Sequence, residues 1–147
     1  MTSLKEFYKK SLALEKAFPD IQDKVLNDSA DKYAEANAKQ QFNTGKKSDG
    51  STIGKYSTTT INIKQRKKQP TDRMTLEDTK SFHSGFFGKL ENGNIKISST
   101  DIKTRMLVSR YGSDIFGLMQ NYRYQVSRKV VLPIYLKEIK KKLKLKP

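Results

Sequence analysis

Apolar side chains in the first third of the chain recur at the spacing of an α-helix. Between residues 3 and 42 they stand three or four positions apart, and an Ala-rich end at 34–38 also favours a helix. Ser3 and Glu6 form the pattern of a capping box, whereas Pro19 interrupts the run. The stripe consists of Leu4, Phe7, Tyr8, Ser11, Leu12, Leu14, Ile21, Val25, Leu26, Ser29, Tyr33 and Ala36. We expect one kinked helix or two helices, with this stripe packed on the protein's own core.

Residues 43–74 form a long polar stretch after this helical region. Residues 43–54 are rich in glycine, residues 56–63 carry enough β-branched side chains to be extended, and residues 64–74 are basic. Connections of this length are usually functional or disordered. We expect an extended arm that becomes ordered on a neighbouring copy of the chain. Its candidate inter-subunit contacts are Ile53 and Tyr56 as anchors, with Ile61 and Ile63 beside them.

Residues 75–118 have the pattern of a β-rich region with short helices. The dipeptide Asn92-Gly93 is a strong hairpin signal, and residues 94–98 alternate as a half-buried strand does. The pattern predicts a hairpin with strands at about 82–91 and 94–99. The single histidine, His83, would then be a half-exposed residue of the first strand.

Short helices are expected on either side of this hairpin. Residues 75–79 fit a helical turn with Thr75 as its N-cap. Residues 101–111 fit a helix that begins at Asp101 and stops at Gly112.

The last segment, residues 119–147, has helical spacing and a basic composition. Pro133 lies inside it, so either the helix kinks there or a new helix starts near Val131. Together the patterns predict an α+β fold in a single domain, 1–147. Its parts are a long N-terminal helical segment (1–42), a long polar arm (43–74), a central β-hairpin region (75–118) and a basic C-terminal helix (119–147).

The positive charge is confined to the last two thirds of the chain. Residues 1–42 hold seven Lys and seven Asp/Glu, so residues 43–147 carry the whole formal net charge of +15. Such a field attracts polyanions or acidic protein surfaces, although a lysine run is also commonly a solvated helix face. Pro133 and the lack of Trp or Phe nearby argue against a membrane-surface helix. The candidate residues for contact with a polyanion or an acidic partner are Lys137, Lys140, Lys141, Lys142, Lys144 and Lys146.

Catalytic and metal-binding patterns are weak. The chain has no cysteine and one histidine, which leaves no disulfide, no thiolate metal site and little basis for a His-dependent catalytic unit. The Gly45-to-Ser48 run is not a phosphate loop, because Gln40 stands where that motif requires glycine. The neighbouring acids Glu77 and Asp78 are explained by helix capping. We expect no enzyme, no metal and no cofactor. Without a signal peptide or membrane span, we expect a soluble protein made in a cytoplasm.

Several landmarks together resemble a family of small virion proteins of tailed bacteriophages that infect Bacteroidetes. The landmarks are Asp49-Gly50-Ser51-Thr52-Ile53-Gly54-Lys55-Tyr56, then Thr60 and Lys64, Thr75-Leu76-Glu77-Asp78-Thr79, and Tyr111-Gly112-Ser113-Asp114-Ile115-Phe116-Gly117-Leu118. The arrangement is also similar to neck and tail-completion proteins, the head–tail connectors, which enter a strand through Thr-Gly-x-Leu. The corresponding site here is Thr79-Lys80-Ser81-Phe82, without the glycine.

The resemblance implies a structural virion protein in the phage neck, assembled as a ring between portal and tail. Its partners would be copies of itself and portal, adaptor or tail proteins, with non-specific contact to packaged DNA and none to a membrane. Two alternatives stay open. One is a basic protein that binds nucleic acid on its own, and the other is a tail-tube or tail-terminator subunit.

Overall fold

The structure, a computed structural model, describes residues 3–144 and has the mixed α+β composition that the sequence predicts. A 3₁₀ turn at Ser113–Ile115 and a π-helical turn at Ser127–Val131 accompany the regular elements. The elements are α1 (Leu4–Thr44), α2 (Thr58–Arg66), α3 (Ser81–Ser84), β1 (Phe86–Glu91), β2 (Asn94–Ser99), α4 (Thr104–Tyr111), α5 (Gln120–Val126) and α6 (Leu132–Leu143).

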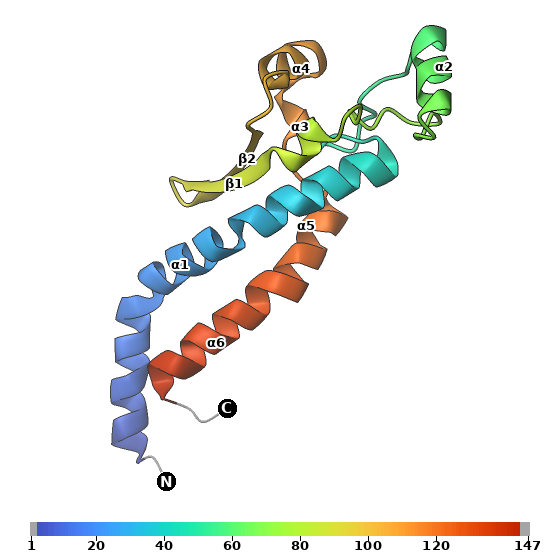
Figure 1. Ribbon diagram of the computed structural model, residues 1–147. Helices are drawn as coiled ribbons and strands as arrows, with labels where there is room; N and C mark the ends of the chain where they lie inside the picture. The colour runs from blue at the N-terminus through green and yellow to red at the C-terminus, as the bar shows by residue number, and fades with distance from the viewer. Residues whose placement is uncertain (1–2, 145–147) are drawn as a thin grey trace.

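The helical first third is one helix with a kink. The Ser3 hydroxyl accepts a hydrogen bond from the Glu6 amide at 3.2 Å, which is one half of the predicted capping box. Pro19 lies inside α1, and Figure 1 shows the blue N-terminal part of the helix at an angle to the rest. The helix ends at Gly45, whose φ of 62° suits a residue without a side chain.

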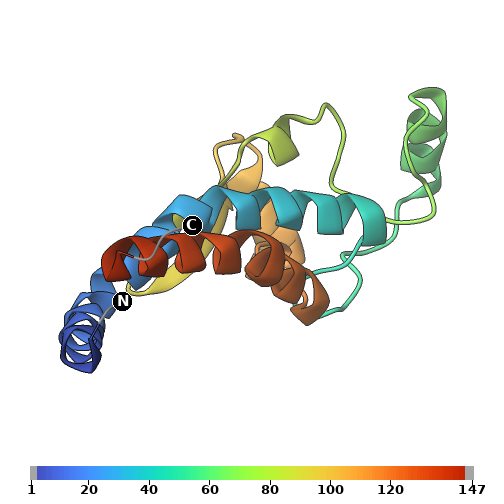
Figure 2. The same ribbon diagram turned by 90° about the horizontal axis from the view of Figure 1, so that it is seen from below.

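The long helix lies between the hairpin and the C-terminal helices (Figures 1 and 2). Ile21 and Val25 of α1 pack with Val131 to form the centre of the core, and Tyr33 and Ile134 pack beside them. This cluster is small, in keeping with a chain of which about a third is apolar.

The predicted hairpin is confirmed, with a shorter first strand. Strands β1 and β2 pair antiparallel from Phe86 opposite Ser99 to Glu91 opposite Asn94, around the Asn92-Gly93 turn. Residues 81–84 are a short helix, so the prediction of a strand from about 82 is wrong there. The hairpin packs so closely on α1 that a Cβ on Gly88 would stand 2.0 Å from the Ala30 carbonyl oxygen.

The helical turn predicted at residues 75–79 is absent. Leu76 has a φ of 58°, which takes the backbone out of the right-handed helical region. Thr75 is fully buried, and its hydroxyl accepts a hydrogen bond from the Glu77 amide in a side-chain turn. The helix predicted at 101–111 does form, but it begins at Thr104, after a turn in which the Asp101 carboxylate accepts from the Lys103 amide.

The last segment is continuous through Pro133. Residues Ser127–Val131 widen into a π-helical turn directly before α6, and Pro133 lies in the first turn of α6. A proline lacks an amide hydrogen and crowds the carbonyl four residues back, so a wider turn at that point relieves both problems. The second predicted alternative is thus right about the place of Pro133, in the first turn of a helix that starts at Leu132, although this helix continues from the π-helical turn without a break.

Three buried amides on α1 hold the segment that leads into α5. Asn37 accepts a hydrogen bond from the Gly117 amide at 3.0 Å, and Gln40 accepts one from the Met119 amide at 2.8 Å. Gln41 donates to the Ile115 carbonyl, as does Asn37. These polar residues were not predicted to have a role, although they continue the helical spacing of the buried face.

Candidate functional site

The lysines predicted to contact polyanions are exposed at the C-terminal end. Within the described residues they are Lys137, Lys140, Lys141, Lys142 and Lys144; Lys146 lies outside these residues. Positions 137, 140 and 141 share one face of α6 because they are three and four residues apart. The structure thus presents this part of the predicted site to solvent.

Tertiary packing adds lysines from the other end of the chain. A groove of about 620 Å³ runs between the first turns of α1 and the end of α6. Lys9 and Lys10 line it from α1, opposite Lys141, Lys142 and Lys144. Lys9 and Lys10 were not predicted from the sequence, because the first third of the chain has no net charge and no local lysine run.

The two acids of this groove are already paired. Glu6 contacts Lys10 at 3.1 Å, and Glu138 contacts Lys24 at 2.7 Å. The hydrogen bond from Lys24 lowers the pKa of Glu138, and the same contact raises the pKa of Lys24, so both charges persist over a wide pH range. The remaining lysines give the groove a net positive charge suited to a polyanion.

The first turns of α1 leave an apolar face uncovered. Leu4, Phe7, Tyr8 and Leu12, here called the α1 stripe, are 85%, 55%, 64% and 41% exposed. The prediction that the whole stripe packs on the protein's own core is therefore wrong for these residues. The reason is the orientation of the helix, which turns its polar side toward α6 to line the groove.

A second uncovered apolar surface lies on the C-terminal helices. A hollow of about 460 Å³, here called the α6 hollow, is lined by Tyr124, Ser127, Arg128, Val131, Leu132 and Tyr135. Tyr124 and Leu132 are 60% and 50% exposed. Exposed aromatic and aliphatic groups that border a hollow are typical of protein interaction surfaces.

The base of the predicted arm packs on its own chain. Ile53 is 5% exposed, and the Tyr56 hydroxyl accepts a hydrogen bond from the Thr75 amide at 2.9 Å. Both residues therefore anchor the arm within the subunit, which corrects the prediction that they anchor it on a neighbour.

The outer part of the arm is the helix α2, and not an extended segment. Ser57 caps it by accepting a hydrogen bond from the Thr60 amide at 3.2 Å. Figures 1 and 2 show α2 standing away from the rest of the molecule. Ile61 is half-buried and Ile63 is 46% exposed on this helix, and their contact with a neighbour stays a prediction.

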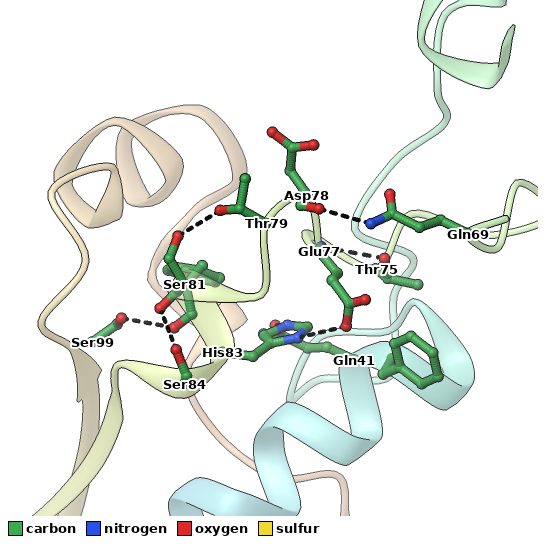
Figure 3. Close-up of polar contacts among 12 residues, drawn as sticks. Gln41, Gln69, Thr75, Glu77, Asp78, Thr79, Ser81, His83, Ser84 and Ser99 are labelled. Carbon is green, nitrogen blue, oxygen red and sulfur yellow. Dashed lines mark hydrogen bonds and ion pairs between the residues drawn. The ribbon is translucent and has the colours of Figure 1, made fainter. Parts of the chain in front are cut away.

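His83 lies in a buried polar cluster (Figure 3). Its Nε2 lies 3.0 Å from Gln41 Oε1, and its side chain is only 10% exposed, so it is neither on a strand nor half-exposed as predicted. Burial is the main cause that lowers the pKa of His83 to about 4; a hydrogen bond with the Thr75 backbone opposes this shift and Lys64 adds to it. Because the ring is neutral at pH 7, Glu77 at 3.9 Å forms no ion pair with it. This geometry suits a structural histidine.

Metal and membrane features are not found in the part of the chain that the structure describes. Among residues 3–144, no group of three or more His, Cys, Asp or Glu side chains is placed to hold a metal ion. None of the helices within that range is both long and apolar enough to span a membrane.

Comparisons of the chain with protein-family models, curated proteins and solved structures give no match.

Proposed function

We propose that this chain is a structural subunit that assembles with copies of itself into a ring in the head–tail connector of a tailed phage. The observation that carries the proposal is the uncovered α1 stripe. Burying one such large apolar side chain is worth roughly 1.5–3 kcal/mol. Four of them in water on one helix face favour association, and a ring forms when such a contact joins two different surfaces and closes.

The phage setting rests on the sequence resemblance, whose landmarks the fold brings together. The Ser48 amide, one residue before the first landmark, donates to the Asp114 carbonyl of the last landmark at 2.9 Å. Thr75, in the middle landmark, is joined to Tyr56 of the first. Landmarks that are far apart in sequence thus form one connected region beside the end of α1.

Light scattering after size-exclusion chromatography tests the proposal, followed by electron microscopy of the eluted particles. The expected result is a discrete oligomer that appears as a ring. A monomer over the whole accessible concentration range would contradict it. A ring found within virions at the tail tube or the tail end, and not in the neck, would favour the tail-tube or tail-terminator alternative.

The lysine groove favours a second candidate function, which is binding of nucleic acid by the free protein. Lysines from both ends of the chain converge on this groove, and its two acids are paired. A stand-alone binder would remain monomeric and shift duplex DNA, with affinity that falls steeply as salt rises. A ring that shows no such affinity would argue against this second function.

A further inference from the structure

We propose that the α1 stripe of one copy packs antiparallel on the α6 hollow of the next copy. This inference rests on the proposed function, because it names the two surfaces through which the ring would form. The occupant of the hollow is thus a second copy of this chain. Three features of the subunit lead to it: the direction of the stripe, the position of the hollow and the charge on each surface.

The α1 stripe is directed away from its own C-terminal helices. Glu6, Lys9 and Lys10 occupy the side of α1 that faces α6, where they line the lysine groove. The stripe lies on the other side of the same turns. The fold therefore leaves the stripe available to another molecule.

The α6 hollow offers an apolar surface of helical shape. Its exposed residues Tyr124 and Leu132 are followed by Leu136, which is 48% exposed one turn further on. These positions form a strip along α5 and α6 with spacings of eight and four residues, so a second helix can lie along them. The strip continues beyond the hollow toward the end of α6, which gives room for the full length of the stripe.

One pair of opposite charges makes the two surfaces complementary and sets the relative direction of the two helices. Glu15 lies on the stripe's face of α1, seven positions after Tyr8, and Arg128 lies in the hollow with Nη1 2.9 Å from the Tyr124 hydroxyl. Within residues 3–144 neither Glu15 nor Arg128 forms an ion pair. Placing Glu15 opposite Arg128 in antiparallel order puts Tyr8 opposite residue 135, beside the exposed Leu136. The parallel order would instead place Leu4 opposite residue 117, ahead of the start of α5 at Gln120, and would leave the exposed Leu132 and Leu136 uncovered.

The contact joins two different surfaces, so every copy offers one stripe and one hollow. Such a heterologous contact extends from copy to copy and closes into a ring when the rotation allows. A pairing of the stripe with itself would bury only one surface of each copy and end at a dimer.

Disulfide trapping tests this register cleanly, because the chain contains no cysteine. Protein carrying Tyr8→Cys is mixed with protein carrying Leu136→Cys and oxidised. A disulfide requires Cα atoms within about 7 Å, so the antiparallel contact predicts a covalent heterodimer on non-reducing gels. The matched control is Tyr8→Cys mixed with Tyr124→Cys. In the antiparallel register Tyr124 lies opposite residue 19, about 16 Å along the helix from Tyr8, and little cross-linking is expected.

The outcomes separate this inference from the function on which it rests. Cross-linking of the first pair but not of the control supports the antiparallel contact, and the double variant Tyr8→Cys/Leu136→Cys should give a ladder of covalent oligomers. Tyr8→Cys that links only to itself, or no link in either mixture while rings are intact, would overturn the inference and leave the ring. If the protein is monomeric in light scattering, both fail. Thermal unfolding of each variant by circular dichroism checks the fold, and the exposure of all three positions predicts little change.

Discussion

The side-chain oxygen of Gln41 lies 3.0 Å from Nε2 of His83, and this contact joins the last turn of α1 to α3, the short helix before the hairpin. The amide nitrogen of Gln41 donates to the Ile115 carbonyl, so its oxygen is an acceptor and His83 Nε2 carries the proton. One amide thus connects three segments that are far apart in sequence. The neutral state of His83 is part of this connection, because a second proton would place a charge in a buried site.

The pKa of His83 predicts a loss of stability in mild acid. Its pKa is about 4 in the folded protein and about 6.5 when unfolded. Between these values the unfolded chain binds more protons than the folded protein. The contribution of neutral His83 to the free energy of unfolding is therefore fully present above about pH 6.5 and is lost as the pH drops toward 4. We expect a loss of about 2 kcal/mol between pH 7.5 and pH 5, measured by urea unfolding.

The control for this prediction is His83→Gln. The variant loses some stability at every pH, but the part of the pH dependence between 7.5 and 5 should disappear. An equal pH dependence in both proteins would assign the effect to other groups. The carboxylates whose pKa values are lowered, such as Asp78 and Glu91, contribute mainly below pH 5, and the comparison with His83→Gln cancels the remainder because both proteins share them.

Asn37→Leu should destabilise the protein by about 1–3 kcal/mol, because it removes the acceptor of the partly buried Gly117 amide from a fully buried position on α1. Urea unfolding measures the change. The matched control is Asn27→Leu on the exposed side of the same helix, with an expected change within about 0.5 kcal/mol. Equal effects from the two substitutions would show that the hydrogen bond to the loop contributes little.

Gly88→Ala should be among the most damaging single-methyl changes in the hairpin. The added Cβ would stand 2.0 Å from the Ala30 carbonyl oxygen, and backbone atoms on both sides must move apart. We expect a cost of roughly 3 kcal/mol, at the upper end of the usual overpacking range. Gly93→Asn is the control, because that glycine has a φ of 73° but open space around it, and asparagine tolerates the left-handed region. Thermal unfolding of the two variants should differ clearly.

Charge exchange should test the pairing of Glu15 with Arg128 across copies. Glu15→Arg alone and Arg128→Glu alone are each expected to weaken assembly, roughly three- to tenfold in the dissociation constant, because each places like charges opposite one another. The combined variant should recover most of the loss. Analytical ultracentrifugation gives the constants, and additive weakening in the combined variant would contradict the pairing.

The lysine groove predicts a salt-dependent interaction with duplex DNA. Replacing Lys140, Lys141, Lys142 and Lys144 with Gln should lower the slope of log affinity against log salt by about 0.9 for each phosphate that the variant no longer neutralises. Lys9→Gln should act in the same direction, because Lys9 lines the same groove. Lys39→Gln, exposed on α1 away from the groove, is the control. Unchanged slopes would assign these lysines to solvent or to an acidic protein surface.

The sequence predicted the elements whose signals are local. The capping pattern at Ser3, the turn at Asn92-Gly93 and the stop at Gly112 each act within a few residues, and the structure confirms all three. The prediction was wrong at residues 58–66, where a capping serine outweighs the low helix propensity of three threonines. It was wrong again near Leu76, where a φ of 58° takes the backbone out of the helical region beside the buried Thr75.

The sequence by itself determined a long helical first third, the hairpin and the basic C-terminal helix, because periodicity and turn chemistry depend on near neighbours. It left open whether Pro19 kinks one helix or separates two, and the structure shows one kinked helix. Only the tertiary structure decided which side of each helix is covered. The first turns of α1 carry both apolar and polar sides, and packing beside α6 placed Lys9 and Lys10 along the groove and left Phe7 and Tyr8 on the uncovered side. Helical spacing identifies an apolar stripe, but the position of the neighbouring helix determines whether that stripe meets the core or the solvent.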